Sequence, residues 1–192
     1  MRLVFDCETN GLLHVLDRVH SLVIRDVDTG EITSCCNATG YKTIEEGLQL
    51  LSQADLLIGH NVINFDMRAL GKIYPEFKIK DDCKIYDTLI VSRVWAPELE
   101  PVDTRKYAHI ESKYKGKHSL AAWGERLGVQ KIKFLQESKE KLPASANPWE
   151  HWSEEMQKYC EGDTLVSLAL YEYFLTQSFD KRCHELEHEF AC

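Results

Sequence analysis

Five segments of the chain have the hydrophobic pattern of β-strands. The first is a short apolar run of the buried-strand type. The next two alternate apolar and polar positions on either side of the turn Thr29-Gly30, which predicts an antiparallel hairpin. The fourth is a continuous apolar run, typical of a strand buried on both faces. The predicted strands lie in residues 3–5, 19–28, 31–36, 55–59 and the beginning of 84–94.

Periodic apolar positions predict helices between and after these strands. Thr43 opens the first helix as part of a capping box with Glu46. Residues 60–71 predict a second helix, with Asn64 as its N-cap and Gly71 as its stop. A further helix follows the last strand within 84–94, and the others occupy residues 118–127, 149–174 and 180–191.

This order of strands and helices indicates an α/β fold in which helices cover a mixed sheet. No repeat or linker divides the chain, so residues 1–192 are expected to form a single domain. Residues 95–117 and 131–148 contain prolines and predict irregular loops. The first loop is basic, which fits a solvated surface or a phosphate-contacting one equally well. Its basic residues are Arg105, Lys106, Lys113, Lys115 and Lys117.

Composition narrows the class of protein. The chain is 44% hydrophobic, which fits an ordinary globular domain. Its formal net charge of −8 argues against bulk attraction to nucleic acid, although a local site remains open. No apolar stretch approaches the ~18 residues of a membrane span, and no targeting segment begins the chain. Seven cysteines without a C-x-x-C pair favour reduced thiols. We therefore expect a soluble, cytoplasmic protein without a membrane partner.

Two carboxylates at the end of the first predicted strand are the first candidate for chemistry. Asp6 and Glu8 are two residues apart, so their side chains project to one face of the strand. Carboxylates this close raise each other's pKa unless a cation or a proton lies between them. Taken alone, the pair also fits a strand that ends in the polar turn Thr9-Asn10-Gly11.

Further acidic residues occur where helices are expected to meet the sheet. Asp66 lies early in the predicted helix 60–71, and Tyr159 and Asp163 share one face of the long helix because they are four residues apart. Four carboxylates can all ionise together if they hold hard divalent cations, which prefer oxygen ligands. Two such ions clamp the attacking and leaving oxygens of a phosphoryl displacement. A phenol beside them can orient the attacking water.

Three motifs that contain these residues resemble the exonuclease motifs of the DEDD 3′–5′ exonuclease superfamily, in its tyrosine branch. They are Asp6-Cys7-Glu8, residues 61–66 and residues 159–163. Three further segments are similar to the proofreading exonuclease domain of phage family-A replicative DNA polymerases, and the resemblance covers nearly the whole chain. These segments are residues 87–93, 118–124 and 149–156.

The resemblance implies an RNase H-like fold and two Mg²⁺ or Mn²⁺ ions. In this family pattern Asp6 bridges both metals, Glu8 and Asp163 complete one metal site, and Asp66 serves the other. Tyr159 acts with Glu8 to position the nucleophilic water. The five residues are therefore expected to be catalytic, and the four acids among them to bind metal.

The resemblance also implies contacts with the 3′ end of single-stranded DNA. Leu12 matches an apolar residue that wedges against the terminal base, and Thr9 belongs to the same turn. Asn61, Phe65 and His118 match substrate-contacting positions, although Asn61 lies five residues before Asp66, as in the phage branch. The implied activity is hydrolysis from the 3′ end to nucleoside 5′-monophosphates, in proofreading. A separate DNA polymerase subunit is an expected partner, and a phage-encoded protein would act in the host cytoplasm.

Three alternatives remain open from the sequence. The acids do not distinguish DNA from RNA, so an RNA exonuclease similar to ribonuclease D fits them too. A catalytically silent module that binds a polymerase is the second alternative. The third is a zinc peptidase, because residues 184–188 satisfy the pattern H-E-x-x-H, in which two histidines on one helix face bind zinc and the glutamate acts as base. Only four residues follow that motif.

Overall fold

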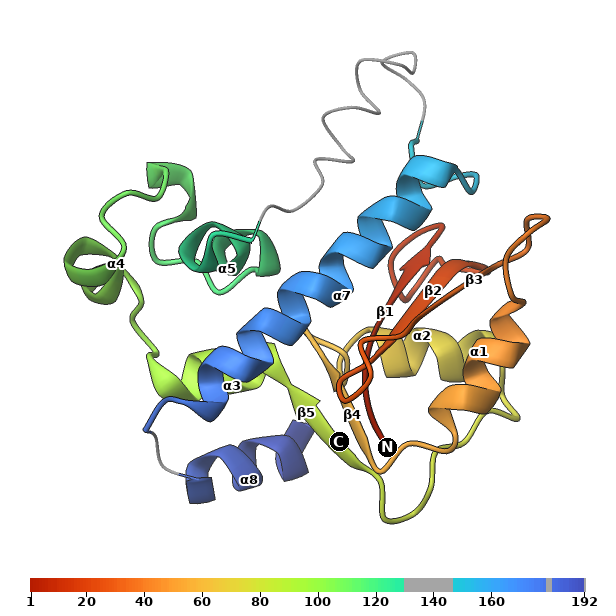
Figure 1. Cartoon of the computed structure of the whole chain (residues 1–192), viewed down its shortest axis with the longest axis horizontal. Helices are drawn as coiled ribbons and strands as arrows, with labels where there is room; N and C mark the ends of the chain where they lie inside the picture. Colours follow the sequence, from red (N-terminus) through yellow and green to blue (C-terminus); the bar gives the residue numbers. More distant parts are fainter. Residues whose placement is uncertain (130–146, 179–180, 192) are drawn as a thin grey trace.

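The computed structural model describes residues 1–129, 147–178 and 181–191, and in these residues five strands form one mixed sheet (Figure 1). The strand order is β3-β2-β1-β4-β5. β2 is antiparallel to both β1 and β3, and β4 is parallel to both β1 and β5. The predicted hairpin and the predicted α/β class are confirmed. The strands are β1 (Arg2–Thr9), β2 (Val19–Asp26), β3 (Ile32–Cys36), β4 (Leu56–Gly59) and β5 (Lys84–Asp87).

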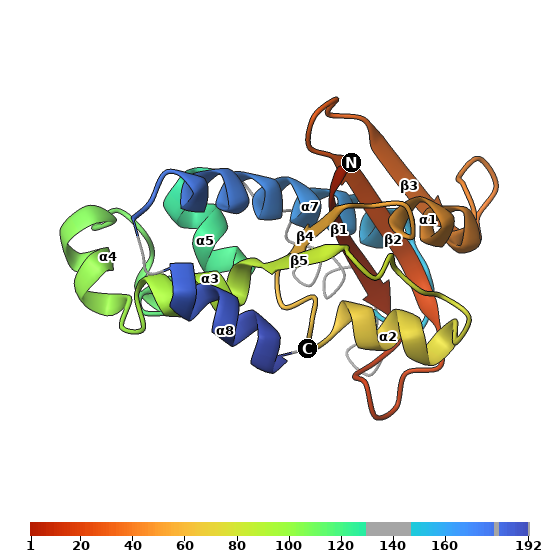
Figure 2. The same cartoon turned by 90° about the horizontal axis from the view of Figure 1, so that it is seen from below.

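Helices cover both faces of this sheet. The long helix α7 (Glu154–Leu175) crosses one face, whereas α1 (Ile44–Leu51) and α2 (Asp66–Ile73) pack against the other (Figures 1 and 2). The remaining helices lie beside β5 and beyond its end. They are α3 (Thr88–Trp95), α4 (Glu100–Lys106), the 3₁₀ helix η1 (Ser112–Tyr114), α5 (Leu120–Leu127) and α8 (Lys181–Ala191). In the described part of the chain, no helix has both the length and the apolarity that a bilayer span requires.

Alternation along β1 decides which side chains reach which face. Leu3 and Phe5 are fully buried in the core formed with α1 and α2. Val4 packs on the opposite face, in the cluster that includes a tyrosine of α7. Asp6 and Glu8 continue the Val4 face, so both carboxylates lie on one face of β1, as the sequence predicted. This is the face that α7 covers.

Several predicted helix ends are confirmed. Thr43 and Glu46 form the capping box of α1 through both reciprocal hydrogen bonds. Gly128 ends α5 with a φ of 68°, a left-handed conformation that costs glycine nothing. The long helix begins later than predicted, at Glu154, because the Ser153 side chain accepts the N–H of Met156 and caps it there.

The start of α2 differs from the prediction. The helix begins at Asp66, its N-cap position is Phe65, and no side chain caps it, so the prediction of Asn64 as N-cap is wrong. Gly71 lies inside the helix, which continues to Ile73, so the predicted stop is also wrong.

The helix α2 starts late because residues 60–65 form a turn after β4. Asp87, at the end of β5, stabilises this turn. The buried Asp87 carboxylate accepts the N–H groups of Asn61 and Ile63, at 2.9 and 3.2 Å. Asn61 adopts a φ of 67°, which asparagine tolerates better than most residues. Gly59 allows β4 to approach β1 here, because a Cβ atom would lie 2.8 Å from the carbonyl oxygen of Phe5. These long-range contacts keep residues 60–65 out of the helix.

The first predicted loop is more ordered than expected. Residues 95–117 include α4 and η1, so the prediction of an irregular segment is wrong for these two helices. Asp103 of α4 forms a buried ion pair with Arg126 of α5, 23 residues later. Local sequence patterns do not reveal such a pair. Most of the second predicted loop, residues 130–146, lies outside the described residues.

Candidate active site

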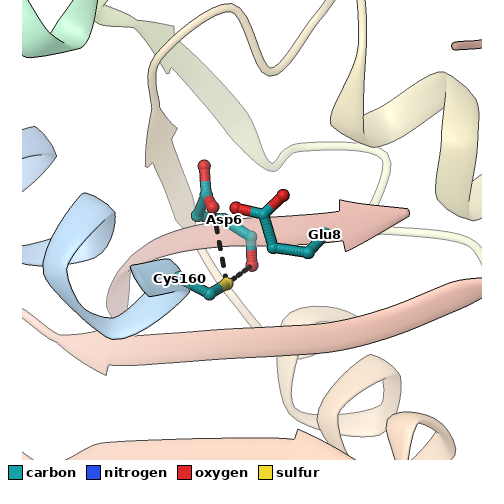
Figure 3. A group of neighbouring side chains, drawn as sticks. All are labelled: Asp6, Glu8 and Cys160. Carbon is teal, nitrogen blue, oxygen red and sulfur yellow. Dashed lines mark hydrogen bonds between the residues drawn. The ribbon is translucent and has the colours of Figure 1, made fainter. Parts of the chain in front are cut away.

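Asp6 and Glu8 form the centre of the candidate site together with Cys160 of α7 (Figure 3). One donor atom from each residue, two carboxylate oxygens and the thiol sulfur, lie within 4.8 Å of one another. The Cys160 thiol donates to the backbone carbonyl oxygen of Asp6 at 3.2 Å and lies 3.4 Å from its carboxylate oxygen Oδ2. The contact joins the end of β1 to the middle of α7. The predicted acidic pair is therefore assembled at the interface of sheet and helix.

Asp66 reaches the same end of β1 from α2. Strand β4 pairs with β1 only as far as Val4, and beyond this point the Asp66 carboxylate accepts the N–H of Cys7 at 2.9 Å. Burial, and after it the negative charges of Asp66 and Asp6, raise the pKa of the Cys7 thiol well above its ordinary range. A third carboxylate therefore lies against the backbone between Asp6 and Glu8.

Asp163 approaches this site from α7. It is 5% exposed and lies one helical turn beyond Cys160. Burial raises the pKa of the Cys160 thiol well above its ordinary value, and the charges of Asp6, Glu8 and Asp163 add to the effect. Three acids thus act electrostatically on one buried thiol. The structure brings Asp163 near the Asp6 and Glu8 pair, as the sequence predicted.

The pKa of Asp66 is raised to about 7, chiefly because the carboxylate is buried. Hydrogen bonds from Cys7 favour the charged form and oppose this shift, whereas the carboxylate of Asp87 adds to it. An unfolded chain releases the same proton near pH ~3.9. Between these two pH values the folded state binds more protons than the unfolded state.

Without divalent cations, thermal stability is therefore expected to fall as the pH rises from about 4 to about 7 and to level off above that range. Thermal melting in EDTA across this range measures the effect. Asp66→Asn should flatten the curve because the buried group no longer titrates. Asp81→Asn, which changes an exposed acid in a turn, should leave it unchanged. Equal slopes in wild type and Asp66→Asn would contradict the prediction.

Tyr159 lies on α7 one turn before Asp163, and its ring packs against Trp149. The two ring centroids are 6.1 Å apart, with an interplanar angle of 71°. Trp149 comes from the segment that precedes the helix. Tyr159 is thus on the helix face predicted from its spacing, with an aromatic partner that the sequence did not predict.

A cavity of about 530 Å³ opens beside Glu8. Four residues predicted for catalysis or substrate contact line it, and Leu12 and Val15 on its wall are strongly exposed, at 65% and 62%. Exposed apolar side chains around a carboxylate suit a ligand with both a flat apolar part and a charged part. The described residues of the lining are Glu8, Thr9, Asn10, Gly11, Leu12, Val15, Phe65, Asn147 and Trp149.

Asn61 and His118 are placed differently, since neither is among the described residues that line the cavity. The backbone N–H of Asn61 binds Asp87. The ring nitrogen Nδ1 of His118 lies 2.7 Å from the Ser92 hydroxyl. The same hydroxyl accepts the indole N–H of Trp123, and this second hydrogen bond joins α3 to α5. Substrate contact by Asn61 and His118 stays a prediction.

His188, the last residue of the H-E-x-x-H motif, has a structural role. Nε2 of His188 accepts the backbone N–H of Asp87 at 2.8 Å, and the imidazole is buried. That nitrogen is therefore occupied by the end of β5. The side chain of His184 lies outside the described residues. The zinc alternative has no support from His188.

Four residues of the site were not predicted from the sequence as functional: Cys160, Asp87, Trp149 and His20. Cys160 could have been found from its place beside Tyr159, on a face that turns toward β1. Asp87 could have been suspected because it ends a strand, where polar side chains gather. Nothing local to Trp149 or His20 indicates that they meet, because they are 129 residues apart.

The chain is similar in sequence to two phage polymerases. It is 29% identical to the DNA-directed DNA polymerase of Escherichia phage T7 and 30% identical to that of Enterobacteria phage T3. Each match includes 91% of this chain and 26% of the polymerase, so the chain spans about a quarter of the length of these curated relatives. No protein-family model matches the chain. The resemblance to phage DNA polymerases is confirmed.

Solved structures of nucleases share its fold. A structure described as the apo form of the nuclease matches 99% of this chain and 77% of its own, with a TM-score of 0.61 and 18% identity. Brucella melitensis NrnC bound to pGG matches with a TM-score of 0.55 and 14% identity, over 99% of this chain and 79% of its own. Brucella melitensis NrnC with bound Mg²⁺ matches with a TM-score of 0.54 and 17% identity, over 99% of this chain and 81% of its own. The expected RNase H-like fold is confirmed.

Proposed function

We propose that this relative of the T7 and T3 DNA polymerases is a divalent-metal-dependent 3′–5′ exonuclease that acts on single-stranded DNA. The observation that supports the proposal best is the position of Glu8, which belongs both to the acidic group around Asp6 and to the wall of the cavity. A nucleotide in the cavity would present its phosphate to that group. Binding and hydrolysis would then occur at adjoining points of one site.

The donor set fits Mg²⁺ or Mn²⁺. Asp6 and Glu8 offer oxygen ligands within reach of one cation. Asp66, which binds the Cys7 N–H, and Asp163, whose charge acts on Cys160, would complete two metal sites, as the family pattern implies. A bound divalent ion would neutralise charge on the phosphate and make water a better nucleophile. The similarity of fold to NrnC with bound Mg²⁺ is consistent with this proposal.

The protein's own residues would direct the reaction as follows. Water attacks phosphorus in line with the bond to the 3′ oxygen of the penultimate nucleotide, and that bond breaks. The Glu8 carboxylate accepts a hydrogen bond from the attacking water, and the Tyr159 phenol orients it. The departing oxygen takes up a proton, and the terminal nucleotide leaves as a 5′-monophosphate. Burial raises the pKa of Asp66 to about 7, so a bound cation would favour its charged form.

The cavity wall favours a single-stranded end over a duplex. Leu12, Val15, Phe65 and Trp149 present apolar surface to an unpaired base, whose π face binds such surfaces with little sequence preference. We propose a proofreading role in association with a DNA polymerase, because the sequence relatives are polymerases. The chain would supply the exonuclease domain of that assembly.

Digestion of matched oligonucleotides tests the function. A 5′-labelled single-stranded DNA with Mg²⁺ should shorten one nucleotide at a time from its 3′ end and release 5′-mononucleotides. The same sequence as RNA should be digested more slowly, because the sequence relatives are DNA polymerases. Faster digestion of RNA would favour the ribonuclease D-like alternative. The absence of digestion with either Mg²⁺ or Mn²⁺, together with binding to a polymerase, would favour a silent module.

A further inference from the structure

Trp149 lies between the cavity and the tyrosine expected to act on water. Trp149 lines the cavity together with Glu8 and Phe65. Its ring makes the edge-to-face contact with Tyr159, with centroids 6.1 Å apart. Tyr159 is not among the described residues of the cavity lining. Trp149 therefore contacts both the space for a ligand and the phenol behind it.

The backbone of Trp149 is held by a residue of its own segment, Asn147, and by a residue of β2, His20. Its N–H donates to the Asn147 side chain at 3.1 Å, and its carbonyl oxygen accepts a hydrogen bond from Nε2 of His20 at 3.1 Å. His20 lies on β2, next to the end of β1 that carries Glu8. Burial lowers the pKa of His20, which favours the neutral ring. Because the backbone of Trp149 is fixed in this way, the indole can move only by rotation about its side-chain bonds.

Within the proposed exonuclease function, on which this inference rests, we infer that Trp149 contacts the terminal base and positions Tyr159. A base that fills the cavity presses against the indole, and the indole sets the place of the phenol. Stacking on an aromatic side chain holds a base without reading its identity. A catalytic group must be held within a fraction of an ångström, so a loss of this support lowers the rate even when substrate is saturating.

Steady-state kinetics on a single-stranded oligodeoxynucleotide with Mg²⁺ separates the two effects. Trp149→Ala should raise KM by about tenfold because the stacking surface is lost, and it should lower kcat by about tenfold because Tyr159 loses its support. Trp149→Phe should recover most of the KM. In a Tyr159→Phe background, the effect of Trp149→Ala on kcat should largely vanish. A merely structural role for Trp149 would keep that effect in both backgrounds.

Trp152→Phe is the matched control. Trp152 is three residues away but packs on Tyr41 and donates its indole N–H to Gln157, and it is not among the described cavity residues. Titration with 5′-dTMP and MgCl₂ should change the tryptophan fluorescence of wild type and Trp152→Phe, and the change should be lost in Trp149→Phe. Thermal melting of every variant shows whether it has folded.

The outcomes separate this inference from the proposed function. If wild type digests DNA and an Asp6 and Glu8 variant does not, then unchanged KM and kcat in Trp149→Ala would overturn the role of Trp149 alone. If wild type is inactive, the proposed function fails first. In that case a dTMP response lost in Trp149→Phe would still support the contact, and no response in wild type would overturn it as well.

Discussion

The double variant Asp6→Asn, Glu8→Gln is expected to lose digestion of single-stranded DNA by at least ~10³-fold in kcat/KM, because the charge stabilisation by a bound metal contributes several kcal/mol to such reactions. The substitutions keep the shape of both side chains and remove the charges that would hold cations. The donors of Asp6 and Glu8 lie within 4.8 Å of each other, so each charge is part of the same site. The measurement is the initial rate of shortening of a 5′-labelled oligonucleotide.

The control for this variant removes the same two charges elsewhere. Glu76 and Asp81 are exposed in the turns between α2 and β5. Glu76→Gln, Asp81→Asn should digest DNA at the wild-type rate. Thermal melting in EDTA should show that Asp6→Asn, Glu8→Gln is at least as stable as wild type, since it relieves repulsion between neighbouring carboxylates. Wild-type digestion by that variant would remove the basis of the proposed function.

Arg126→Met is expected to lower the free energy of unfolding by about 3–5 kcal/mol, because it leaves a buried carboxylate without its ionic partner. The side chains of Arg126 and Asp103 are both 0% exposed and are joined by two hydrogen bonds of 2.7 and 2.8 Å. Arg126 also donates to the carbonyl oxygen of Lys117 at 2.8 Å, and its guanidinium lies 4.8 Å from the ring centroid of Trp123. Urea unfolding followed by circular dichroism measures the loss.

A variant that lacks both charges shows how much of the lost stability comes from leaving the Asp103 carboxylate unpaired. Arg126→Met with Asp103→Leu should be more stable than Arg126→Met alone, because the second change removes the unpaired carboxylate. Burial alone would raise the pKa of Asp103, but hydrogen bonds from Arg126 and from the N–H of Gly116 hold it below its ordinary value. A loss of stability well under 1 kcal/mol in Arg126→Met would contradict this account of how α4 and α5 are joined.

The acids of the site could be predicted because each one depends on a local pattern. The alternation of β1 puts Asp6 and Glu8 on one face, and the spacing of Tyr159 and Asp163 puts them on one side of a helix. Asp66 was predicted from its motif although the start of its helix was not. The shared face of Asp6 and Glu8, and that of Tyr159 and Asp163, therefore follow from the periodicity of single elements.

The parts that the sequence did not predict depend on contacts between distant residues. Asp87 holds the turn before α2 from 26 residues away, and Arg126 orders the segment around α4. His20 and Trp149 form a hydrogen bond although they are 129 residues apart in the sequence. Periodicity does not show which polar side chain will satisfy which backbone group, because that pairing is set only when the elements pack.

Mn²⁺ binding tests the central claim most directly, since the account requires Asp6 and Glu8 to hold the cations. Titration of MnCl₂ into the wild-type protein, followed by the electron spin resonance signal of free Mn²⁺, should show two bound ions per chain. Asp6→Asn, Glu8→Gln should bind none at these sites, and Glu76→Gln, Asp81→Asn should match wild type. Equal Mn²⁺ binding by wild type and Asp6→Asn, Glu8→Gln would contradict the account.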